Sequence, residues 1–445
     1  MAGRYKAYPE YKNSGIEWLG EIPTHWKVNS VKRLTDFQVG WTPSTGKDEN
    51  FVGENLWANI SDLKSKYLDD TAKRISDIAA QTASMDITPK GSLLYSFKLS
   101  VGAVSFANKD MYTNEAIASF LSTSKLPLSY LYYSLPIFVI ENAATNIYGA
   151  KILNQELIKN AKLIEPTYFE AEKIANFLDH ETAKIDTLIA KQEKLIELLK
   201  EKRQAVISHA VTKGLNPQAP MKDSGVEWLG EVPEHWEVTP LKHLCRFSGG
   251  GTPTKDNLSY WTNGTIPWVS PKDMKSLRVT QTCDYITEKA VVESSTNYVD
   301  SGALLMVVRS GILQRTIPVA INDVVVTLNQ DMKALKFNNK MAVDFALYFI
   351  VGNEKALLLE WSKEGATVES IEHEYLANGL LSVPPLSEQL FIVQYLSAEM
   401  EKFSQLETKA SLGIELLKER KTALISAAVT GKIDVRDWEF QGIEG

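Results

Sequence analysis

Residues 172–213 read EKIANFLDHETAKIDTLIAKQEKLIELLKEKRQAVISHAVTK, and this stretch decides the fold. It contains neither proline nor glycine, and its apolar residues recur at the three- and four-residue spacing of a heptad seam. The pattern predicts one amphipathic helix about 60 Å long, at 1.5 Å per residue. A helix of that length cannot bury its apolar stripe inside a domain of ordinary size, so it requires a partner helix.

The partner is a second copy of the same helix near the end of the chain. Residues 414–430 (IELLKERKTALISAAVT) match residues 196–212 (IELLKEKRQAVISHAVT) at a constant shift of 218. We therefore predict that the two helices pair with each other along an apolar seam. The predicted helix-pairing residues are Leu178, Ile185, Leu188, Leu195 and Leu199 in the first helix and Leu396, Phe403, Leu406, Leu417 and Leu424 in the second.

The helix is only the tail of a larger repeat. Residues 12–28 (KNSGIEWLGEIPTHWKV) return at 222–238 as KDSGVEWLGEVPEHWEV, with 12 of 17 positions identical. Between the repeated ends, the copies share a Gly-x-Thr-Pro turn, one tryptophan and one aspartate, and otherwise diverge. These shared residues are Gly40/Gly250, Thr42/Thr252, Pro43/Pro253, Trp57/Trp268 and Asp62/Asp273. The whole chain is an internal duplication.

The divergent middle of each copy is predicted to be a mixed α/β domain, called a head below. Strand-like apolar runs at 92–97, 101–106, 303–308 and 323–328 are separated by turn residues. The predicted fold is α+β and internally duplicated, with two heads joined by two long helices that form an antiparallel coiled coil. The predicted segments are 1–165 (first head), 166–214 (first helix), 215–385 (second head), 386–433 (second helix) and 434–445 (tail).

Composition limits the class of protein. The 445 residues are 44% hydrophobic and 23% charged, as in soluble globular proteins. Neither a signal peptide nor a membrane-spanning run is present, so we expect a cytoplasmic protein without membrane contact. Cys245 and Cys283 are too few for a disulfide framework or a cysteine zinc site. The net charge of −7 argues against tight nucleic-acid binding by the chain alone.

The sequence also argues against catalysis. Residues 40–48 (GWTPSTGKD) resemble a phosphate-binding loop, but the glycine spacing is wrong and Asp48 stands where a hydroxyl is needed. Residues 271–273 (PKD) with Lys275 do not make a nuclease core, because the second acidic ligand lacks the usual spacing, and no Asn-Pro-Pro-aromatic motif of an amino-methyltransferase is present. The histidines form no HExxH-like pair. We expect no catalytic residue, no metal site and no bound cofactor.

Several motifs together resemble the DNA specificity subunit of a Type I restriction-modification system. They are the tandem SGxEWLGExPxHWxV segments, the Gly-x-Thr-Pro turns, TIPWVSPKDMK at 265–275, RSGILQ at 309–314, LNQDMKAL at 328–335, and the helix ends AVISHAVT and ALISAAVTGKID. The resemblance covers essentially the whole chain. It implies that each head is a target-recognition domain that reads one half of a split, asymmetric site on double-stranded DNA.

The resemblance also implies partners. The two helices would form a spacer that docks two methyltransferase subunits, and restriction–translocase subunits would join the complex. AdoMet, ATP and Mg²⁺ would then reside on those partners, and the chain would not form a homo-oligomer by itself. A helix of about 60 Å compares with about 34–36 Å per DNA turn, so the spacer would act as a ruler between the heads.

Candidate base-reading residues lie in the divergent heads. Direct readout favours Arg or Lys on guanine, Asn or Gln on adenine, and Ser or Thr on either. The first head offers Thr42, Ser44, Lys47, Ser61, Lys98, Ser100 and Asn114. The second head offers Thr252, Thr254, Lys255, Ser270, Lys272, Arg309, Ser310, Gln314, Arg315, Asn329 and Gln330. For any one of these residues, a purely structural role in a solvated loop or turn is an equally good interpretation.

An alternative function is a duplicated coiled-coil scaffold that organises protein partners without reading DNA. The helix ends are nearly identical between the copies while the heads diverge. A pure scaffold has no evident reason to maintain that contrast, so it favours DNA recognition.

Overall fold

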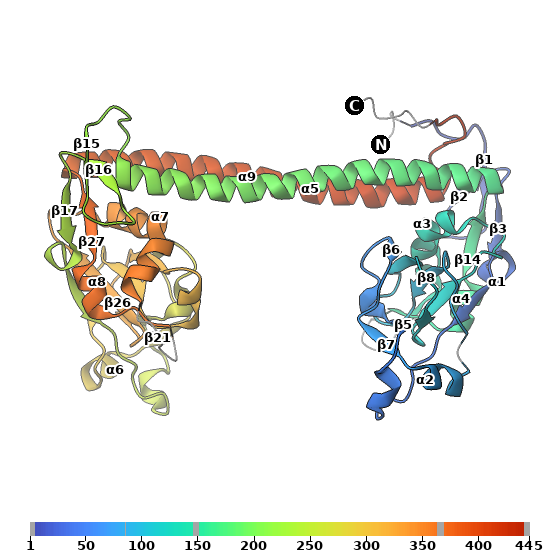
Figure 1. Cartoon of the computed structure of the whole chain (residues 1–445), viewed down its shortest axis with the longest axis horizontal. Coiled ribbons are helices and arrows are strands. Elements are labelled where there is room, and N and C mark those ends of the chain that lie inside the picture. The colour runs from blue at the N-terminus through green and yellow to red at the C-terminus, as the bar shows by residue number, and fades with distance from the viewer. Residues whose placement is uncertain (1–4, 85, 146–150, 363–368, 440–445) are drawn as a thin grey trace. The chain divides into compact units, whose positions relative to one another are not determined.

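The computed structural model describes residues 5–84, 86–145, 151–362 and 369–439. Its contacts divide the chain into two units, Met1–Lys191 with Gly413–Gly445 (unit 1) and Gln192–Leu412 (unit 2). Helices α5 (Tyr168–Lys213) and α9 (Leu386–Val429) each contribute one half to either unit. Within each unit the two helix halves lie side by side (Figure 1). The long helices are therefore not separate from the heads, because each half packs with its own head.

Unit 1 contains a five-stranded sheet and a smaller three-stranded sheet. The larger sheet has the order β4 (Phe37–Val39), β11 (Ile117–Phe120), β8 (Leu93–Ser96), β9 (Val104–Ala107) and β6 (Tyr67–Leu68). The smaller one has the order β10 (Tyr112–Thr113), β5 (Asn55–Ala58) and β7 (Lys73–Ile75). The remaining strands and α-helices of this head are β1 (Tyr11–Asn13), β2 (Glu21–Pro23), β3 (Lys27–Ser30), α1 (Val31–Leu34), α2 (Asp77–Thr82), α3 (Leu128–Phe138), β12 (Ala144–Thr145), β13 (Lys151–Ile152), α4 (Gln155–Asn160) and β14 (Lys162–Glu165).

Unit 2 repeats this architecture strand for strand in its larger sheet. That sheet has the order β18 (Cys245–Gly249), β26 (Met332–Phe337), β23 (Leu304–Val307), β24 (Val319–Asn322) and β20 (Arg278–Val279). The second sheet has the order β21 (Asp284–Ile286), β19 (Ile266–Val269), β25 (Val326–Leu328) and β22 (Tyr298–Val299). The remaining strands and α-helices of this head are β15 (Met221–Asp223), β16 (Glu231–Pro233), β17 (Glu237–Pro240), α6 (Glu288–Glu293), α7 (Val343–Trp361), α8 (His373–Asn378) and β27 (Leu380–Val383).

The central strand of each head is buried on both faces, which explains its unbroken apolar run. In β23, Leu304 and Met306 belong to the apolar cluster that contains Phe345 of α7, whereas Leu305 and Val307 belong to the cluster formed with the second sheet. Side chains alternate between the faces of a strand, so one strand serves both layers. Each head is thus a helix packed on a sheet that is packed on a second sheet, and the predicted mixed, duplicated fold is confirmed.

The long helices pair antiparallel in both units. In unit 1, Leu178 and Ile185 from the first half of α5 share a buried cluster with Leu424 from the last half of α9, and Leu417 packs against it. Lys421 donates to Asp186 across the pair at 2.7 Å. In unit 2 the opposite halves meet, and the cluster contains buried Leu396 and Phe403 with Leu199 packed against it.

Three of the ten predicted helix-pairing residues do not lie in the seam. Leu188, Leu195 and Leu406 are 46%, 43% and 48% exposed. Beside Leu188, Ile189 packs against the buried cluster of unit 1, and beside Leu195, Ile196 is half-buried. A residue four positions along a helix lies closer to the starting face than one three positions along, since each residue turns by about 100°. From Ile185 the seam therefore takes a four-residue step to Ile189, and the prediction of Leu188 was wrong by one residue.

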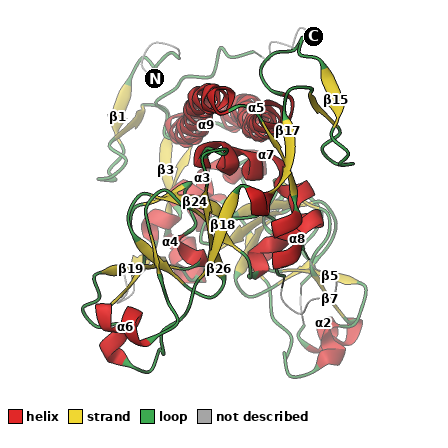
Figure 2. Cartoon of the chain, turned by 90° about the vertical axis from the view of Figure 1, so that its left-hand side faces the viewer, coloured by secondary structure: helices red, strands yellow, loops and turns green. Residues whose placement is uncertain are grey.

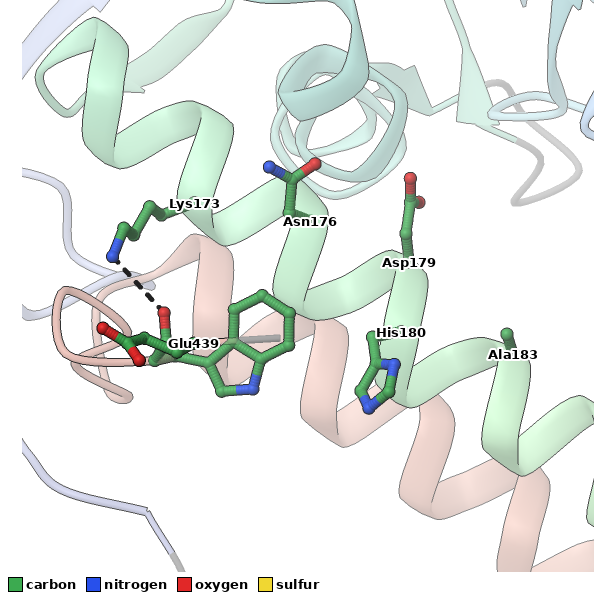
Figure 3. A pocket seen from close by; sticks show the side chains of 7 residues that line it. Lys173, Asn176, Asp179, His180, Ala183 and Glu439 are labelled. Carbon is green, nitrogen blue, oxygen red and sulfur yellow. Dashed lines mark hydrogen bonds between the residues drawn. The ribbon is translucent and has the colours of Figure 1, made fainter. Parts of the chain in front are cut away.

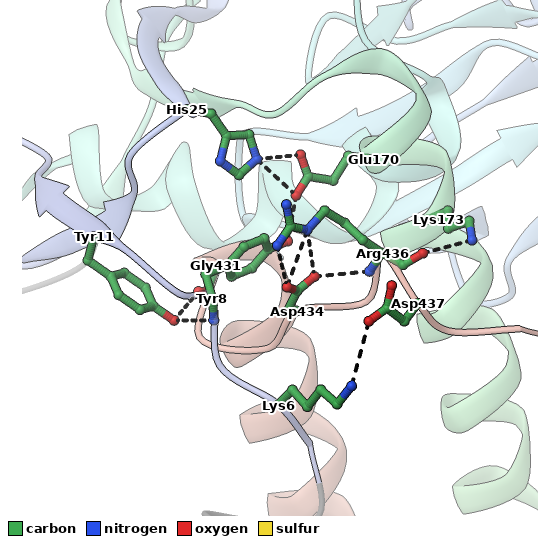
Figure 4. Close-up of polar contacts among 10 residues, drawn as sticks. All are labelled: Lys6, Tyr8, Tyr11, His25, Glu170, Lys173, Gly431, Asp434, Arg436 and Asp437. Carbon is green, nitrogen blue, oxygen red and sulfur yellow. Dashed lines mark hydrogen bonds and ion pairs between the residues drawn. The ribbon is translucent and has the colours of Figure 1, made fainter.

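The segment after α9 returns to the start of the chain within unit 1. Arg436 donates to Asp434 at 2.6 Å, and its guanidinium lies over the ring of Tyr8 (Figure 4). Tyr8 donates to the buried Glu170 at 2.6 Å, and the ring nitrogen of His25 lies 3.0 Å from the same carboxylate. Burial and this hydrogen bond raise the pKa of Tyr8. Burial opposes ionisation of Asp434, but the hydrogen bonds from Arg436 hold its pKa below the usual value.

Trp438 extends the same segment onto α5. Its ring packs edge-on against Phe177 at 5.7 Å, and Lys173 donates to its carbonyl oxygen at 3.3 Å. Figure 3 shows Lys173, Asn176 and His180 on the face of α5 beside this segment, where a cavity of about 650 Å³ opens. The predicted tail 434–445 is therefore packed on unit 1 at least as far as Glu439, and the rest lies outside the described residues.

In unit 2, helix α7 rests directly on α5 and lies between it and the sheet (Figure 2). Gln204 of α5 donates to the carbonyl oxygens of Val351 and Gly352, both at 2.8 Å. A Cβ on Gly352 would lie 2.9 Å from Ile207 Cγ2 and 3.0 Å from the backbone nitrogen of Ser208. The two helix backbones can approach this closely only because residue 352 has no side chain.

We expect Gly352→Ala to lower the free energy of unfolding by about 1–3 kcal/mol, the usual cost of overpacking a core. The matched control is Gly413→Ala in α9, where a Cβ would meet nothing within 4 Å. Alanine is favoured over glycine in a helix, so this control should gain about 0.5–1 kcal/mol. Urea unfolding of both variants measures the difference. Equal stability of Gly352→Ala and the wild type would contradict the close contact.

Candidate nucleic-acid interface

The same set of loops meets in each head. Loop cluster 1 consists of residues 40–47, 59–62, 97–100 and 114–116, and loop cluster 2 consists of residues 250–255, 270–273, 308–315 and 329–331. In cluster 1, Asn114 N donates to Ala58 O at 2.9 Å and Phe97 N donates to Ala116 O at 3.0 Å. In cluster 2, Asn329 N donates to Val269 O at 2.9 Å and Val308 N donates to Asp331 O at 2.8 Å. The two clusters are thus built on equivalent backbone contacts.

The residues shared between the copies hold these loops in place. Trp57 Nε1 donates to Trp41 O in cluster 1, and Trp268 Nε1 donates to Gly251 O in cluster 2, both at 3.0 Å. A Cβ on Gly250 would collide with the carbonyl of Asn329, and one on Gly40 would collide with that of Thr113. The Gly-x-Thr-Pro turn therefore lies against the backbone at the end of β10 or β25, which explains its glycine.

The aspartate shared between the copies, Asp62 or Asp273, accepts hydrogen bonds that hold the loop after β5 or β19. Asp62 accepts from Asn59 N at 2.9 Å, and Asp273 accepts from Ser270 N at 2.9 Å. Partial burial opposes ionisation of Asp273, but hydrogen bonds from the backbone of Cys283 and Ser270 hold its pKa below the usual value. The charged carboxylate thus anchors the loop, and Asp273 is not free to bind a metal or a base.

In head 1 the candidate residues divide by exposure. Ser44, Lys47, Ser61, Lys98 and Ser100 are exposed, whereas Thr42 and Asn114 are half-buried. The Thr42 hydroxyl donates to Glu115, and the Asn114 side chain accepts from Ala116 N at 3.1 Å. Lys98 and Asn114 line a cavity of about 390 Å³ that Glu115 and Lys151 also line.

In head 2 the structure brings four of the eleven candidates together. Lys255, Ser270, Lys272 and Asn329 line a cavity of about 360 Å³ with Trp261 and Asp284. Ser270 and Asn329 are buried and bonded within their own loops, to Asp273 at 2.8 Å and to Asp331 N at 3.0 Å. Lys272 donates to Asp284 at 2.5 Å, and this hydrogen bond raises its pKa. The cavity therefore presents Lys255 and Lys272 as its cationic groups.

The other candidates of head 2 lie on neighbouring surface. Thr254, Arg309, Gln314, Arg315 and Gln330 are exposed, and Thr252 and Ser310 are half-buried. Ser310 caps the short helix η7 (Gly311–Gln314) by accepting from Ile312 N at 3.4 Å. Gln314 and Arg315 close that helix and are not among the residues that line the cavity.

Sequence reasoning missed Glu115, Lys151, Trp261 and Asp284. Glu115 follows Asn114 as Gln330 follows Asn329, and the two asparagines have the same role, since Asn329 accepts from Asp331 N as Asn114 accepts from Ala116 N. Aligning the two Asn positions at a shift of 215, between the shifts of the repeat ends, would have found Glu115. Lys151 reaches its cavity from the hairpin strand β13 and has no comparable sequence pattern.

The family model for the Type I restriction modification DNA specificity domain matches residues 23–198 and 233–416. The chain belongs to this family. Each match begins within one of the repeated segments 12–28 and 222–238 and ends within the long helix that follows, so the repeat seen in the sequence is the family's domain, present twice. The chain therefore belongs with the DNA-recognition components of these systems rather than with their catalytic subunits.

Curated members of the Type I specificity family are similar to this chain. The EcoR124I/EcoR124II specificity subunit of Escherichia coli is 37% identical over 195 residues, which is 43% of this chain and 44% of that relative. The MjaIX specificity subunit of Methanocaldococcus jannaschii is 24% identical over 98% of this chain and 99% of its own length. A chain from a structure of the assembly and conformational transition of a type I R-M system shares the fold, with a TM-score of 0.71 at 14% identity, covering 93% of this chain and 99% of that one.

The described residues contain no group of three or more His, Cys, Asp and Glu side chains placed to hold a metal ion. None of the described helices is both long and apolar enough to cross a membrane.

Proposed function

We propose that this chain reads a bipartite site on double-stranded DNA, with loop cluster 1 on one half-site and loop cluster 2 on the other. One observation carries the proposal: residues shared between the copies hold both loop clusters in the same backbone arrangement, but the exposed side chains of the two clusters differ. Cluster 1 presents Lys98 and Glu115, where cluster 2 presents Arg309 and Gln330. Two loop clusters with the same backbone arrangement and different side chains are suited to recognise two different DNA sequences.

The acidic chain depends on partners for affinity. Non-specific DNA affinity grows with the number of phosphates neutralised, so a chain of net charge −7 binds weakly by itself. We infer that two methyltransferase subunits enclose the duplex and supply most phosphate contacts, and that restriction–translocase subunits join them. AdoMet, ATP and Mg²⁺ then reside on those partners. The chain acts in the cytoplasm as a single copy, because it already carries both heads.

The outer faces of the long helices support this docking. Leucines that turn away from the seam remain exposed in both units: Leu188 and Leu416 in unit 1, and Leu195, Leu198, Leu406 and Leu412 in unit 2. Exposed apolar side chains gathered along a helix mark an interaction surface. The alternative function, a scaffold without DNA readout, would also use these helices but leaves the two loop clusters unexplained.

The test is to co-express the chain with the methyltransferase subunit of its own system and to map methylated bases by single-molecule sequencing. We expect one split motif with a fixed gap, methylated on both strands. Exchanging the second head, residues 215–385, for that of another family member should change one half of the motif and leave the other half unchanged. A stable complex with an active methyltransferase but no motif would favour the scaffold.

A further inference from the structure

Glu115 and Gln330 occupy equivalent places in the two loop clusters. Each follows the asparagine that comes directly after a strand of the smaller sheet, β10 in head 1 and β25 in head 2. Each also accepts a hydrogen bond from the threonine of the Gly-x-Thr-Pro turn, Thr42 to Glu115 Oε2 and Thr252 to Gln330 Oε1. The two side chains have nearly the same shape and differ in one group, a carboxylate oxygen against an amide nitrogen.

The threonine bonds to the oxygen that both side chains have, so its hydrogen bond does not involve the atom at which Glu115 and Gln330 differ. Within the described chain, Glu115 Oε1 has no hydrogen-bond partner in head 1, and Gln330 Nε2 has none in head 2. A carboxylate can only accept, whereas an amide both donates and accepts. At this position, Glu115 of cluster 1 therefore presents only acceptor atoms, whereas Gln330 of cluster 2 presents a donor beside an acceptor.

A carboxylate on a DNA-facing surface needs a specific reason, because phosphates repel it. Lys98 and Lys151 line the same cavity as Glu115 and offset that repulsion, but neither forms an ion pair with it in the described structure. The carboxylate thus remains available to a donor from outside the chain. In the major groove such donors are the exocyclic amino groups of cytosine and adenine.

We propose that Glu115 reads cytosine in one half-site and that Gln330 reads adenine at the corresponding place in the other. Cytosine offers its amino group without an adjacent acceptor, so a carboxylate meets no repulsion there. Adenine offers an amino donor next to the N7 acceptor, which matches an amide and opposes a carboxylate. Thr42 and Thr252 are then positioning residues that fix the orientation of the reading side chain. This inference rests on the proposed DNA-reading function.

The experiment exchanges the two groups in the full chain co-expressed with its methyltransferase subunit. Glu115→Gln should change the preferred base from cytosine to adenine at one position of one half-site, and Gln330→Glu should do the reverse in the other half-site. Preference at that position should shift by about 5- to 150-fold, the range of discrimination of one good base contact. Methylation rates on duplexes carrying each of the four bases there measure the shift.

Controls separate reading from folding and from charge. Each variant carries the residue that the equivalent loop of the other head already accommodates, so the fold should be kept, and thermal unfolding checks this. Glu54→Gln removes the same charge just before β5, at the end of that strand away from the loop cluster, and should leave every base preference unchanged. Thr42→Val should relax preference at the Glu115 position alone.

The outcomes are distinct. If the wild-type chain directs methylation to no motif, the proposed DNA-reading function itself is contradicted. A wild-type motif that Glu115→Gln and Gln330→Glu leave unaltered would overturn only the assignment of these two residues. A changed preference at bases other than cytosine and adenine would overturn it as well.

Discussion

Replacing Leu396 by Ala is expected to lower the free energy of unfolding by about 2–5 kcal/mol, the usual cost of truncating a fully buried leucine. Leu396 of α9 has no exposed surface and belongs to the apolar cluster that joins α9 to the last half of α5 and to the core of head 2. Removing its side chain leaves a cavity that neither the helices nor the sheet can close without moving. Urea unfolding followed by far-UV circular dichroism measures the loss.

The matched control is Leu406→Ala in the same helix. Leu406 is 48% exposed, so the same truncation should cost less than about 1 kcal/mol. The pair of variants tests the phase of the helix seam directly. If both substitutions cost the same, Leu406 is buried in the seam of unit 2, as the heptad pattern of the sequence predicted.

The spacing of apolar residues predicts the long helices but not which face of each helix forms the seam. The absence of proline and glycine over residues 172–213, together with the repeat at 414–430, predicted the two long helices and their pairing. The same stretch offers two heptad phases, one through Leu188 and one through Ile189. Sequence spacing alone does not separate them, because the choice depends on which face the heads and the partner helix cover.

The loop clusters were predicted only in part, for a related reason. Thr42 and Thr252 stood out because they recur in both copies, yet their hydroxyls bond to Glu115 and Gln330 within the chain. Residues that recur in both copies hold the loops in place, whereas the proposed discrimination between DNA bases depends on residues that differ between the copies. Ser270 likewise matched the pattern of a base-reading residue but is buried against Asp273.

Contacts distant in sequence were beyond prediction. Lys151 shares a cavity with Lys98 across more than fifty residues, and Trp438 packs on Phe177 from the far end of the chain. Neither residue has a counterpart at the equivalent place of the other copy that could have drawn attention to it. The surfaces they pack on exist only once the sheets and helices have assembled.

The proposed role of the helices as a spacer predicts a large change in the recognised site when both are lengthened. The insertion adds seven residues between Lys191 and Gln192 of α5 and seven between Leu412 and Gly413 of α9, where the contacts divide the chain into its two units. Seven residues make nearly two full turns, so each unit keeps its own half of the helix pair. The added length is about 10 Å at 1.5 Å per residue, or about three base pairs at 3.4 Å each.

We therefore expect the gap of the split motif to grow by about three base pairs, while both half-sites keep their sequences and the original motif loses its methylation. Inserting two residues at the same two points is the control. It turns one half of each helix by about 200° relative to the other, which directs the apolar seam away from its partner, so methylation should be lost at every gap length. A heptad variant that still methylates the original motif would show that helix length does not set the gap. The docked methyltransferase subunits would then have to set it, because they are the remaining parts of the proposed complex that contact both helices.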